Sequence, residues 1–196
     1  MSEIEIIRMN IKDMLDARGE DVSFIEEHGD VVETARYYNE LIILDTDKTT
    51  VFFALNKDIL KEWKMQEDSV EKMLEKYKMK NFILVLSEQP SSPMMHHIQA
   101  RDKALQAIGG ILQVFYKSQL MYNPLKHILT PPHEKLSEEE SKEVMTKYLI
   151  KNKVKMPIIT KQDPIAQWLG LKHGDIVKIT RYNQTSGTYY YYRCCM

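Results

Sequence analysis

The sequence has almost none of the features that mark secreted and membrane proteins. Only two of its 196 residues are cysteines, Cys194 and Cys195, and adjacent cysteines without a distant partner cannot build a disulfide framework. No apolar run approaches the length needed to cross a bilayer, and the N-terminus lacks the basic flank and the apolar stretch of a signal peptide. These absences predict a reducing cytosolic or nuclear setting and no membrane partner.

Glycine is also scarce, with seven residues in the chain. The only adjacent pair, Gly109 and Gly110, lacks the lysine and spacing of a P-loop and the pattern of a dinucleotide fingerprint. A helix stop explains this pair better. The sequence therefore predicts no nucleotide cofactor and no small-molecule ligand.

Metal ligands in a convergent arrangement are missing as well. His96 and His97 are neighbours on a predicted helix, where successive side chains point about 100° apart, so their imidazoles would not meet at one ion. Cys194 and Cys195 have no CxxC or HxH companion, and neighbouring residues of a strand face opposite sides. We therefore predict no metal and no cofactor.

The sequence contains no GxSxG elbow for a catalytic serine. His127 and His133 flank two prolines in the stretch HILTPPH, and general base chemistry is one interpretation of them. The interpretation that we favour is that the rings hold the proline-rich segment in place through hydrogen bonds.

A metal-dependent nuclease would need acidic residues and an Asp/Glu-x-Lys pair on adjacent strands. Asp45 and Asp47 beside Lys48 come nearest, but they fall in a predicted hairpin turn. The one good Glu-x-Lys pair, Glu62 and Lys64, falls in a predicted helix. We predict no catalytic residue, and we keep a nuclease as the enzyme alternative, to be tested by incubation with plasmid DNA and Mg²⁺.

What the sequence does contain is typical of a globular protein, with 43% hydrophobic and 28% charged residues. The net charge of −1 argues against gripping nucleic acid by electrostatics alone. Charge is nevertheless unevenly divided. Residues 1–121 carry 15 Lys and Arg against 21 Asp and Glu, a net −6, and residues 122–196 carry 12 against 7, a net +5. The difference in net charge suggests that the two parts of the chain lie in different environments.

Hydrophobic periodicity and capping residues predict an α+β protein of two domains. Helices are expected over 3–18, 23–29, 56–78, 92–108, 138–151 and 164–169, and strands over 41–44, 50–55, 81–87, 111–116, 175–182 and 188–195. Prolines at 124, 131 and 132 interrupt regular structure where the charge balance also shifts. We place the domain boundary there, giving domains 1–121 and 122–196.

The last predicted hairpin carries four consecutive tyrosines. Alternation along a strand places Tyr189 and Tyr191 on one face, and Tyr190 and Tyr192 on the other. A hairpin that is aromatic on both faces suits coverage on two sides, either by its own domain alone or by its domain and a partner. The pattern leaves both options open.

From Asn123 onward the chain resembles a family of small RNA polymerase subunits, known by the letter H in archaea, whose eukaryotic counterpart is the fifth subunit shared by the nuclear RNA polymerases. The matching motifs, in order, are His127-Ile-Leu-Thr-Pro-Pro-His133, Leu136-Ser137 with Glu139-Glu140, Met156-Pro-Ile-Ile159, Asp163-Pro164, Leu169-Gly170, Gly174-Asp-Ile-Val-Lys-Ile179 with Arg181, and Thr185-Ser-Gly187 with Tyr189, Tyr192 and Arg193. Order and spacing hold without a detectable insertion. Departures are small: Thr130 replaces the usual valine, Met156 the usual leucine, and Asn183 a common serine.

The first 121 residues match the family less well. Their order of elements looks like the eukaryotic-type N-terminal jaw domain, which is similar in fold to restriction endonucleases but lacks their catalytic residues. The archaeal members of the family consist essentially of the C-terminal part alone. The long N-terminal domain therefore points to a eukaryote, and a nuclear location, or to a large DNA virus, with a location in the virion or the host-cell cytoplasm.

The resemblance implies a non-catalytic structural subunit of a multisubunit DNA-directed RNA polymerase. Its small C-terminal α+β assembly domain would dock on the largest subunit and near neighbouring small subunits, and its jaw domain would approach the downstream duplex DNA. A free-standing adaptor outside a polymerase is a further alternative.

The motifs also supply candidate residues for the subunit interface. They are Asp163, Pro164, Gly170, Arg181, Tyr189, Tyr192 and Arg193. Lys57, Lys61 and Lys64 have helical spacing that would suit a face toward DNA, but an ordinary solvated surface explains them better.

Overall fold

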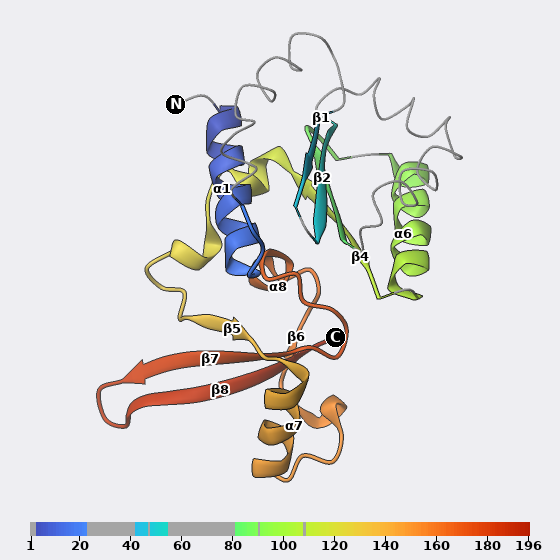
Figure 1. Ribbon diagram of the computed structural model, residues 1–196. Helices are drawn as coiled ribbons and strands as arrows, with labels where there is room; N and C mark the ends of the chain where they lie inside the picture. The colour runs from blue at the N-terminus through green and yellow to red at the C-terminus, as the bar shows by residue number, and fades with distance from the viewer. Residues whose placement is uncertain (1–2, 23–41, 47, 55–80, 90, 108) are drawn as a thin grey trace. The chain divides into compact units, whose positions relative to one another are not determined.

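The computed structural model describes residues 3–22, 42–46, 48–54, 81–89, 91–107 and 109–196 (Figure 1). The chain divides into two compact units, Met1–Tyr122 (unit 1) and Asn123–Met196 (unit 2). The predicted helices 23–29 and 56–78, with Lys57, Lys61, Glu62 and Lys64, lie outside the described residues. Both units combine helices with a sheet, which confirms the predicted α+β class. No helix in the described ranges is long and apolar enough to span a bilayer.

Unit 1 contains a sheet of four strands in the order β1-β2-β3-β4. The strands are β1 (Ile42–Asp45), β2 (Thr49–Ala54), β3 (Asn81–Leu86) and β4 (Ile111–Tyr116). β1 and β2 form the predicted antiparallel hairpin, whereas β2, β3 and β4 run parallel. Each strand lies within one residue of its sequence-based prediction.

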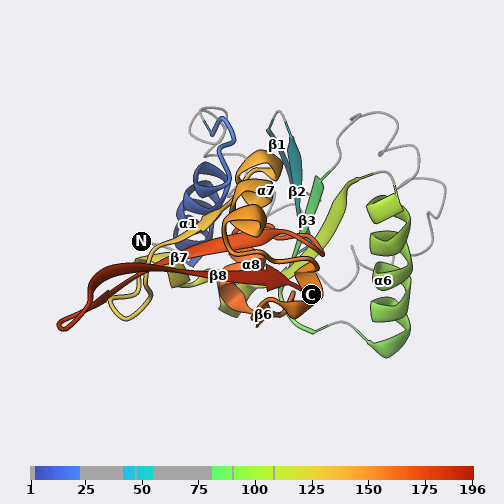
Figure 2. The same cartoon turned by 90° about the horizontal axis from the view of Figure 1, so that it is seen from below.

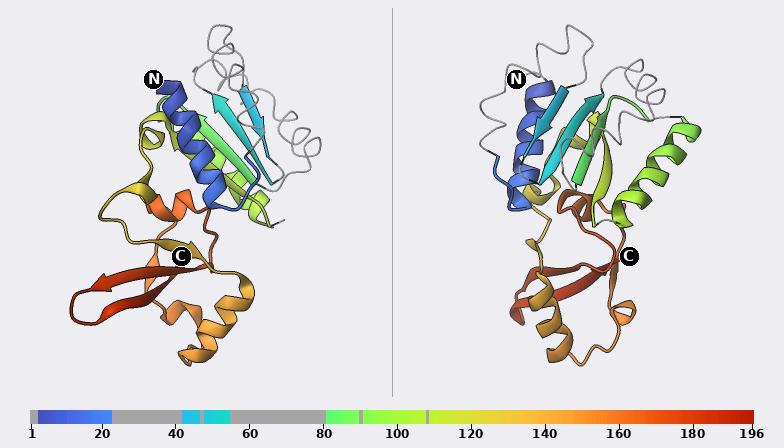
Figure 3. Two further views of the ribbon diagram at one scale, coloured as in Figure 1. Left: turned by 60° about the vertical axis from the view of Figure 1, so that its left-hand side comes forward. Right: turned by 45° about the vertical axis from the view of Figure 1, so that its right-hand side comes forward.

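Helices cover both faces of this sheet, as Figure 3 shows. α1 (Glu3–Ala17) buries Ile7, Ile11 and Leu15. α6 (Ser92–Ala107) buries Ile98 and Leu105 against a cluster that includes Phe52, Phe82, Leu84 and Leu86. Because both faces are covered, β3 reads as the continuous apolar run NFILVL, of which only Asn81 is not fully buried. A short 3-10 helix, η1 (Lys117–Leu120), follows β4.

Unit 2 also has a sheet of four strands, in the order β5-β7-β8-β6. The strands are β5 (His133–Lys135), β6 (Ile158–Ile159), β7 (Ile176–Asn183) and β8 (Gly187–Cys195). β7 and β8 form the predicted antiparallel hairpin, and the short strands β5 and β6 flank it. Since each flanking strand pairs with only two or three residues, the hairpin extends well beyond both of them (Figure 2).

Two separate apolar clusters cover the two faces of the hairpin. One combines Val177, Ile179 and Cys195 with α8 (Pro164–Trp168) and the residues that follow it. The other combines Ile176 and Cys194 with Leu136, Met156 and the half-buried apolar residues of α7 (Glu138–Lys147). The adjacent cysteines thus face opposite sides of β8, as the alternation of a strand requires. The hairpin is covered on two sides within its own unit.

α7 begins as predicted but ends four residues before the predicted Lys151. Ser137 and Glu140 form the expected capping box. At the other end Leu149 adopts a positive φ of 54°, and the amide of Ile150 donates to the carbonyl of Met145 at 2.8 Å. Ile150 then packs against the Met156 cluster. The apolar contact of Ile150 therefore ends the helix where no glycine signals it.

Candidate functional site

Three of the candidate interface residues build the scaffold of α8. The Asp163 carboxylate caps the helix, accepting hydrogen bonds from the amides of Ile165 at 2.8 Å and Ala166 at 3.4 Å. Pro164 occupies the first helical turn, and Gly170 ends the segment with a φ of 61°. These three positions confirm the predicted helix signals. In this structure the three residues fix the ends of α8, and their place in a subunit interface stays a prediction.

Arg181 and Arg193 share one tyrosine ring on the face of the hairpin that α8 covers. The guanidinium carbon of Arg181 lies 5.1 Å from the centre of the Tyr191 ring, and that of Arg193 lies 5.6 Å from it. The register explains the contact, because Arg181 pairs with Tyr189, and Arg193 lies two residues beyond Tyr191 on the same face. We call Arg181 and Arg193 the arginine pair. Tyr189 is 38% exposed beside it.

Tyr191 was not among the candidate residues, although alternation places it on the face of Tyr189. Its ring packs partly buried against the Val177 cluster, so one side of the ring belongs to the core. The same ring lies within cation–π distance of both guanidinium groups, which is favourable for each cation. The structure therefore brings Arg181, Tyr189 and Arg193 together around a residue that the motif comparison did not single out.

His133 lies next to this group, because it pairs with Ile179, which in turn pairs with Tyr191. Its Nδ1 is 2.5 Å from the carbonyl oxygen of Pro131, and the ring of His127 accepts a hydrogen bond from the amide of Leu129 at 3.3 Å. Both rings therefore hold the proline-rich segment, which confirms that interpretation. Burial lowers the pKa of His133, and the charges of Arg181 and Arg193 lower it further, against opposing effects of Pro131 and Asp163.

This shift predicts that unit 2 loses stability in mild acid. The pKa of His133 is lowered on folding, so the unfolded chain binds the proton more tightly. The contribution is therefore fully present above the ordinary histidine pKa of about 6.5 and is lost as the pH falls through the folded value. We expect the thermal midpoint to fall between about pH 7 and pH 5, and to fall less in His133→Gln. If the thermal midpoints of the wild type and of His133→Gln fell equally steeply with pH, the prediction would be contradicted.

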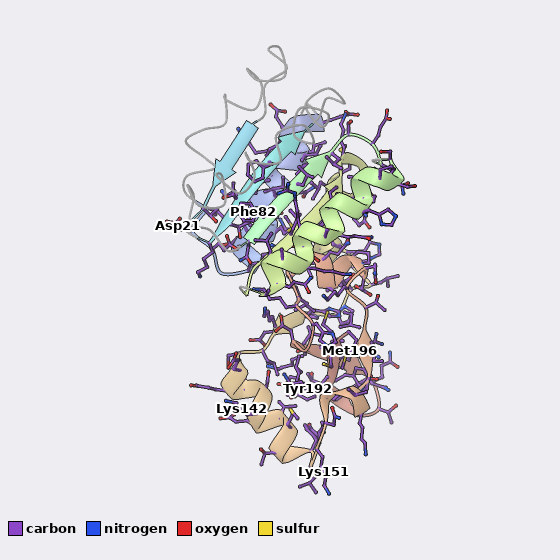
Figure 4. The ribbon with its side chains drawn as sticks, turned by 90° about the vertical axis from the view of Figure 1, so that its right-hand side faces the viewer. Asp21, Phe82, Lys142, Lys151, Tyr192 and Met196 are labelled. Atoms are coloured by element: carbon purple, nitrogen blue, oxygen red, sulfur yellow. The ribbon has the colours of Figure 1, made fainter. Side chains whose placement is uncertain are left out.

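The opposite face of the hairpin is occupied by contacts within unit 2. Tyr192 (labelled in Figure 4) packs against the cluster that includes residues of α7, and its ring centre lies 5.6 Å from that of Tyr148. Burial, followed by the charge of Tyr148, raises the pKa of Tyr192. Lys178 donates to Glu134 at 3.0 Å and lies 5.0 Å from the centre of the Tyr190 ring. Tyr192 therefore contributes to the packing of α7, whatever it contacts outside the unit.

Further exposed apolar side chains lie in the proline-rich segment. Ile128 is 92% exposed and Leu129 is 83% exposed, between the rings of His127 and His133. Apolar side chains of this size are seldom so fully exposed next to each other without a partner. Neither residue is among the candidate interface residues that the motifs supply.

The cysteines are buried thiols, each 0% exposed. Burial raises the pKa of Cys195 to about 11 and also raises the pKa of Cys194. Within the described ranges, no group of three His, Cys, Asp or Glu side chains is arranged to hold a metal ion.

We expect neither thiol to react with an aromatic disulfide reagent at pH 8 while the protein is folded. A thiol reacts as the thiolate. Here the raised pKa keeps both thiols protonated at pH 8, and burial keeps the reagent away from them. Two thiols per chain should react at once in denaturant, which supplies the control. A thiol that reacted in the native state at the rate of a free cysteine would contradict the burial of β8.

In unit 1, the turn considered for nuclease chemistry is held by a buried carboxylate. Glu20, 7% exposed, accepts hydrogen bonds from the hydroxyls of Thr46 at 2.6 Å and Thr49 at 2.7 Å. Lys48 is exposed and donates to the carbonyl of Gly19 at 3.3 Å. Asp47 lies outside the described residues. Both oxygens of Glu20 are thus used to fix the turn between β1 and β2.

Comparison with known proteins assigns unit 2 directly. Residues 122–195 match the family model of the RNA polymerase Rpb5 C-terminal domain. DNA-directed RNA polymerase subunit Rpo5 of Pyrococcus horikoshii is 47% identical over 72 residues, which make up 37% of this chain and 87% of the archaeal protein. The chain belongs to the Rpb5/Rpo5 family. The resemblance expected from the motifs is confirmed.

Eukaryotic members of the Rpb5/Rpo5 family match a different share of the chain. The subunit rpabc1 of RNA polymerases I, II and III from Dictyostelium discoideum is 34% identical over 116 residues, 59% of this chain and 57% of that protein. The corresponding subunit of Caenorhabditis elegans is 37% identical over 95 residues, 46% of this chain and 44% of that protein. The chain spans about half the length of these eukaryotic relatives. Because 116 residues exceed unit 2, the similarity to the Dictyostelium protein extends into unit 1.

Proposed function

We propose that this protein is a non-catalytic, structural subunit of a multisubunit DNA-directed RNA polymerase. The observation that carries the proposal is the 47% identity of unit 2 to an archaeal polymerase subunit across 87% of that protein's length. Similarity over nearly a whole relative supports a common role, whereas similarity of fold alone would not. The catalytic residues of such an enzyme lie in other chains.

In this proposal unit 2 is the assembly domain, which docks on the largest polymerase subunit and neighbouring small subunits. Its surface supports such a role, because it exposes Tyr189, Tyr190, Ile128 and Leu129. Tyrosine and arginine are enriched in the centres of protein interfaces, and exposed apolar pairs mark interaction sites. The net charge of +5 that we count for residues 122–196 would complement an acidic neighbour.

Unit 1 is proposed as a jaw near the downstream duplex, with a fold similar to restriction endonucleases. Its sheet, in which an antiparallel hairpin adjoins parallel strands and helices cover both faces, is compatible with that fold. The use of both Glu20 oxygens for structural hydrogen bonds fits a jaw without nuclease chemistry. A net charge of −6, counted over residues 1–121, favours guiding DNA over gripping it.

Affinity purification from the source cells, followed by mass spectrometry, tests the proposal. The tagged full chain should bring down the large polymerase subunits in stoichiometric amounts, in the nucleus of a eukaryote or in the virion or host-cell cytoplasm for a virus. Isolation of the chain with other proteins and no polymerase subunit would favour the adaptor and reject the proposal. Cleavage of plasmid DNA by the purified chain with Mg²⁺ would also reject it.

A further inference from the structure

The arginine pair of unit 2 is not neutralised by the unit's own acidic residues. In the part of the chain that the structure describes, neither Arg181 nor Arg193 forms an ion pair, although the two guanidinium groups lie on the same tyrosine ring. The Nε of Arg193 is buried and has no hydrogen-bond partner. The buried Nε is costly because it loses water without gaining an acceptor, and the two like charges on one ring repel each other.

Three lysines of unit 2 are partnered within the unit. Lys178 pairs with Glu134 at 3.0 Å, Lys135 pairs with Asp175 at 2.6 Å, and Lys153 donates to the carbonyl of Gly174 at 2.7 Å. Among the described residues, the arginine pair differs from them in having no ion-pair partner. A carboxylate that neutralises the pair would therefore come from outside unit 2.

The geometry limits what this acceptor is. A guanidinium presents several N–H donors in one plane, which match the two oxygens of a carboxylate. The neighbouring His133 does not extend the positive patch, since its pKa is lowered, and Lys135 is engaged with Asp175. Two isolated cations beside the half-exposed Tyr189 suit one or two carboxylates, whereas a nucleic-acid backbone is normally followed by a longer row of cations.

We propose that the arginine pair binds an Asp or Glu side chain of an acidic segment of the largest polymerase subunit. This inference rests on the proposed function and adds the chemistry of the partner to it. The carboxylate accepts hydrogen bonds from the terminal N–H groups of the two guanidinium groups and relieves the repulsion between the pair. Tyr191 holds both groups in position, and Tyr189 covers one side of the contact.

The test uses the full chain in two assays. The first is capture of the polymerase from source extract, and the second is fluorescence anisotropy with overlapping peptides from its largest subunit. Arg181→Gln and Arg193→Gln should each weaken peptide binding about tenfold or more, and the double variant should abolish capture. Arg181→Lys should recover only part of the affinity, because an ammonium group lacks the planar fork. Changing the acidic residues of the bound peptide to Asn or Gln should cause the same loss.

Lys142→Gln is the matched control, because Lys142 is exposed on α7 (Figure 4) and its change removes one positive charge from the same unit. It should leave both assays unchanged. Circular dichroism of each variant establishes folding. If the double variant does not fold, the Arg181→Gln variant alone decides the question, because the buried Nε belongs to Arg193.

The outcomes separate this inference from the proposed function. If the wild-type chain captures the polymerase and the folded double variant captures it equally well, the carboxylate contact is wrong and the proposed function stands. If the wild-type chain captures no polymerase, the proposed function fails. If a 20-base-pair duplex binds the chain, and the double variant but not Lys142→Gln loses that binding, the acceptor is a phosphate and the inference is overturned.

Discussion

A fragment of residues 123–196 is expected to fold alone and to capture the polymerase about as well as the full chain, whereas residues 1–122 should capture none. Unit 2 has its own sheet and two apolar clusters, all formed by residues within it. The Pyrococcus relative consists of little more than the matching segment, because 72 aligned residues make up 87% of its length. Both observations point to a unit whose fold does not depend on unit 1.

Two measurements check this expectation. Urea unfolding of the fragment, followed by circular dichroism, should show one cooperative transition. Capture from source extract should return the same large subunits as the full chain does. A folded fragment that captured nothing would assign docking to unit 1 and contradict the proposed division of roles. An unfolded fragment would show that unit 2 needs unit 1 for stability.

Glu20→Ala is expected to lower the free energy of unfolding of unit 1 by about 3 kcal/mol. The carboxylate is the hydrogen-bond acceptor of two buried hydroxyls, so its loss leaves Thr46 and Thr49 without that partner. It also removes the negative charge that opposes the lowering of the pKa of Arg18, which burial brings to about 10. Urea unfolding of the full chain, followed by circular dichroism, measures the effect.

Glu3→Ala provides the control, because Glu3 is exposed and its pairing with Lys117 is at the surface. It should cost well under 1 kcal/mol. A double variant with Glu20→Leu and Thr49→Val should recover part of the loss, because it removes the Thr49 hydroxyl together with its acceptor. The Thr46 hydroxyl keeps the carbonyl of Thr49 as an acceptor at 3.0 Å. If Glu20→Ala unfolded no more easily than Glu3→Ala, the buried hydrogen bonds would not be what holds the turn.

The helices and strands with local signals were predictable from sequence. The structure has the predicted helix caps: Ser137 and Glu140 form a capping box at the start of α7, and Asp163 caps α8. The end of α7 was predicted wrongly, because Ile150 leaves the helix to join a cluster formed by distant residues. The strands β5 and β6 were missed for a similar reason. They are two or three residues long and owe their conformation to pairing with the final hairpin.

The candidate site was predictable in part. Motif resemblance selected Arg181 and Arg193, but they lie on different strands, so alternation alone does not place them on one face. Their shared contact with Tyr191 depends on the register of β7 and β8, in which Asn183 pairs with Gly187. Gly187 has a φ of 71°, a conformation that other residues adopt only with strain, so the turn fixes that register. The role of Glu20 had no local signal, because its partners lie 26 and 29 residues away.

The division of unit 2 into two clusters has a consequence for how it comes apart. Ile176 and Val177 are adjacent in β7 but belong to different clusters, as do Cys194 and Cys195 in β8. The backbone ladder that both clusters share can therefore open only when both clusters lose their contacts with it. In native-state hydrogen exchange, the amides of β7 and β8 that bond across the hairpin should open together, with one common free energy and no partly open intermediate.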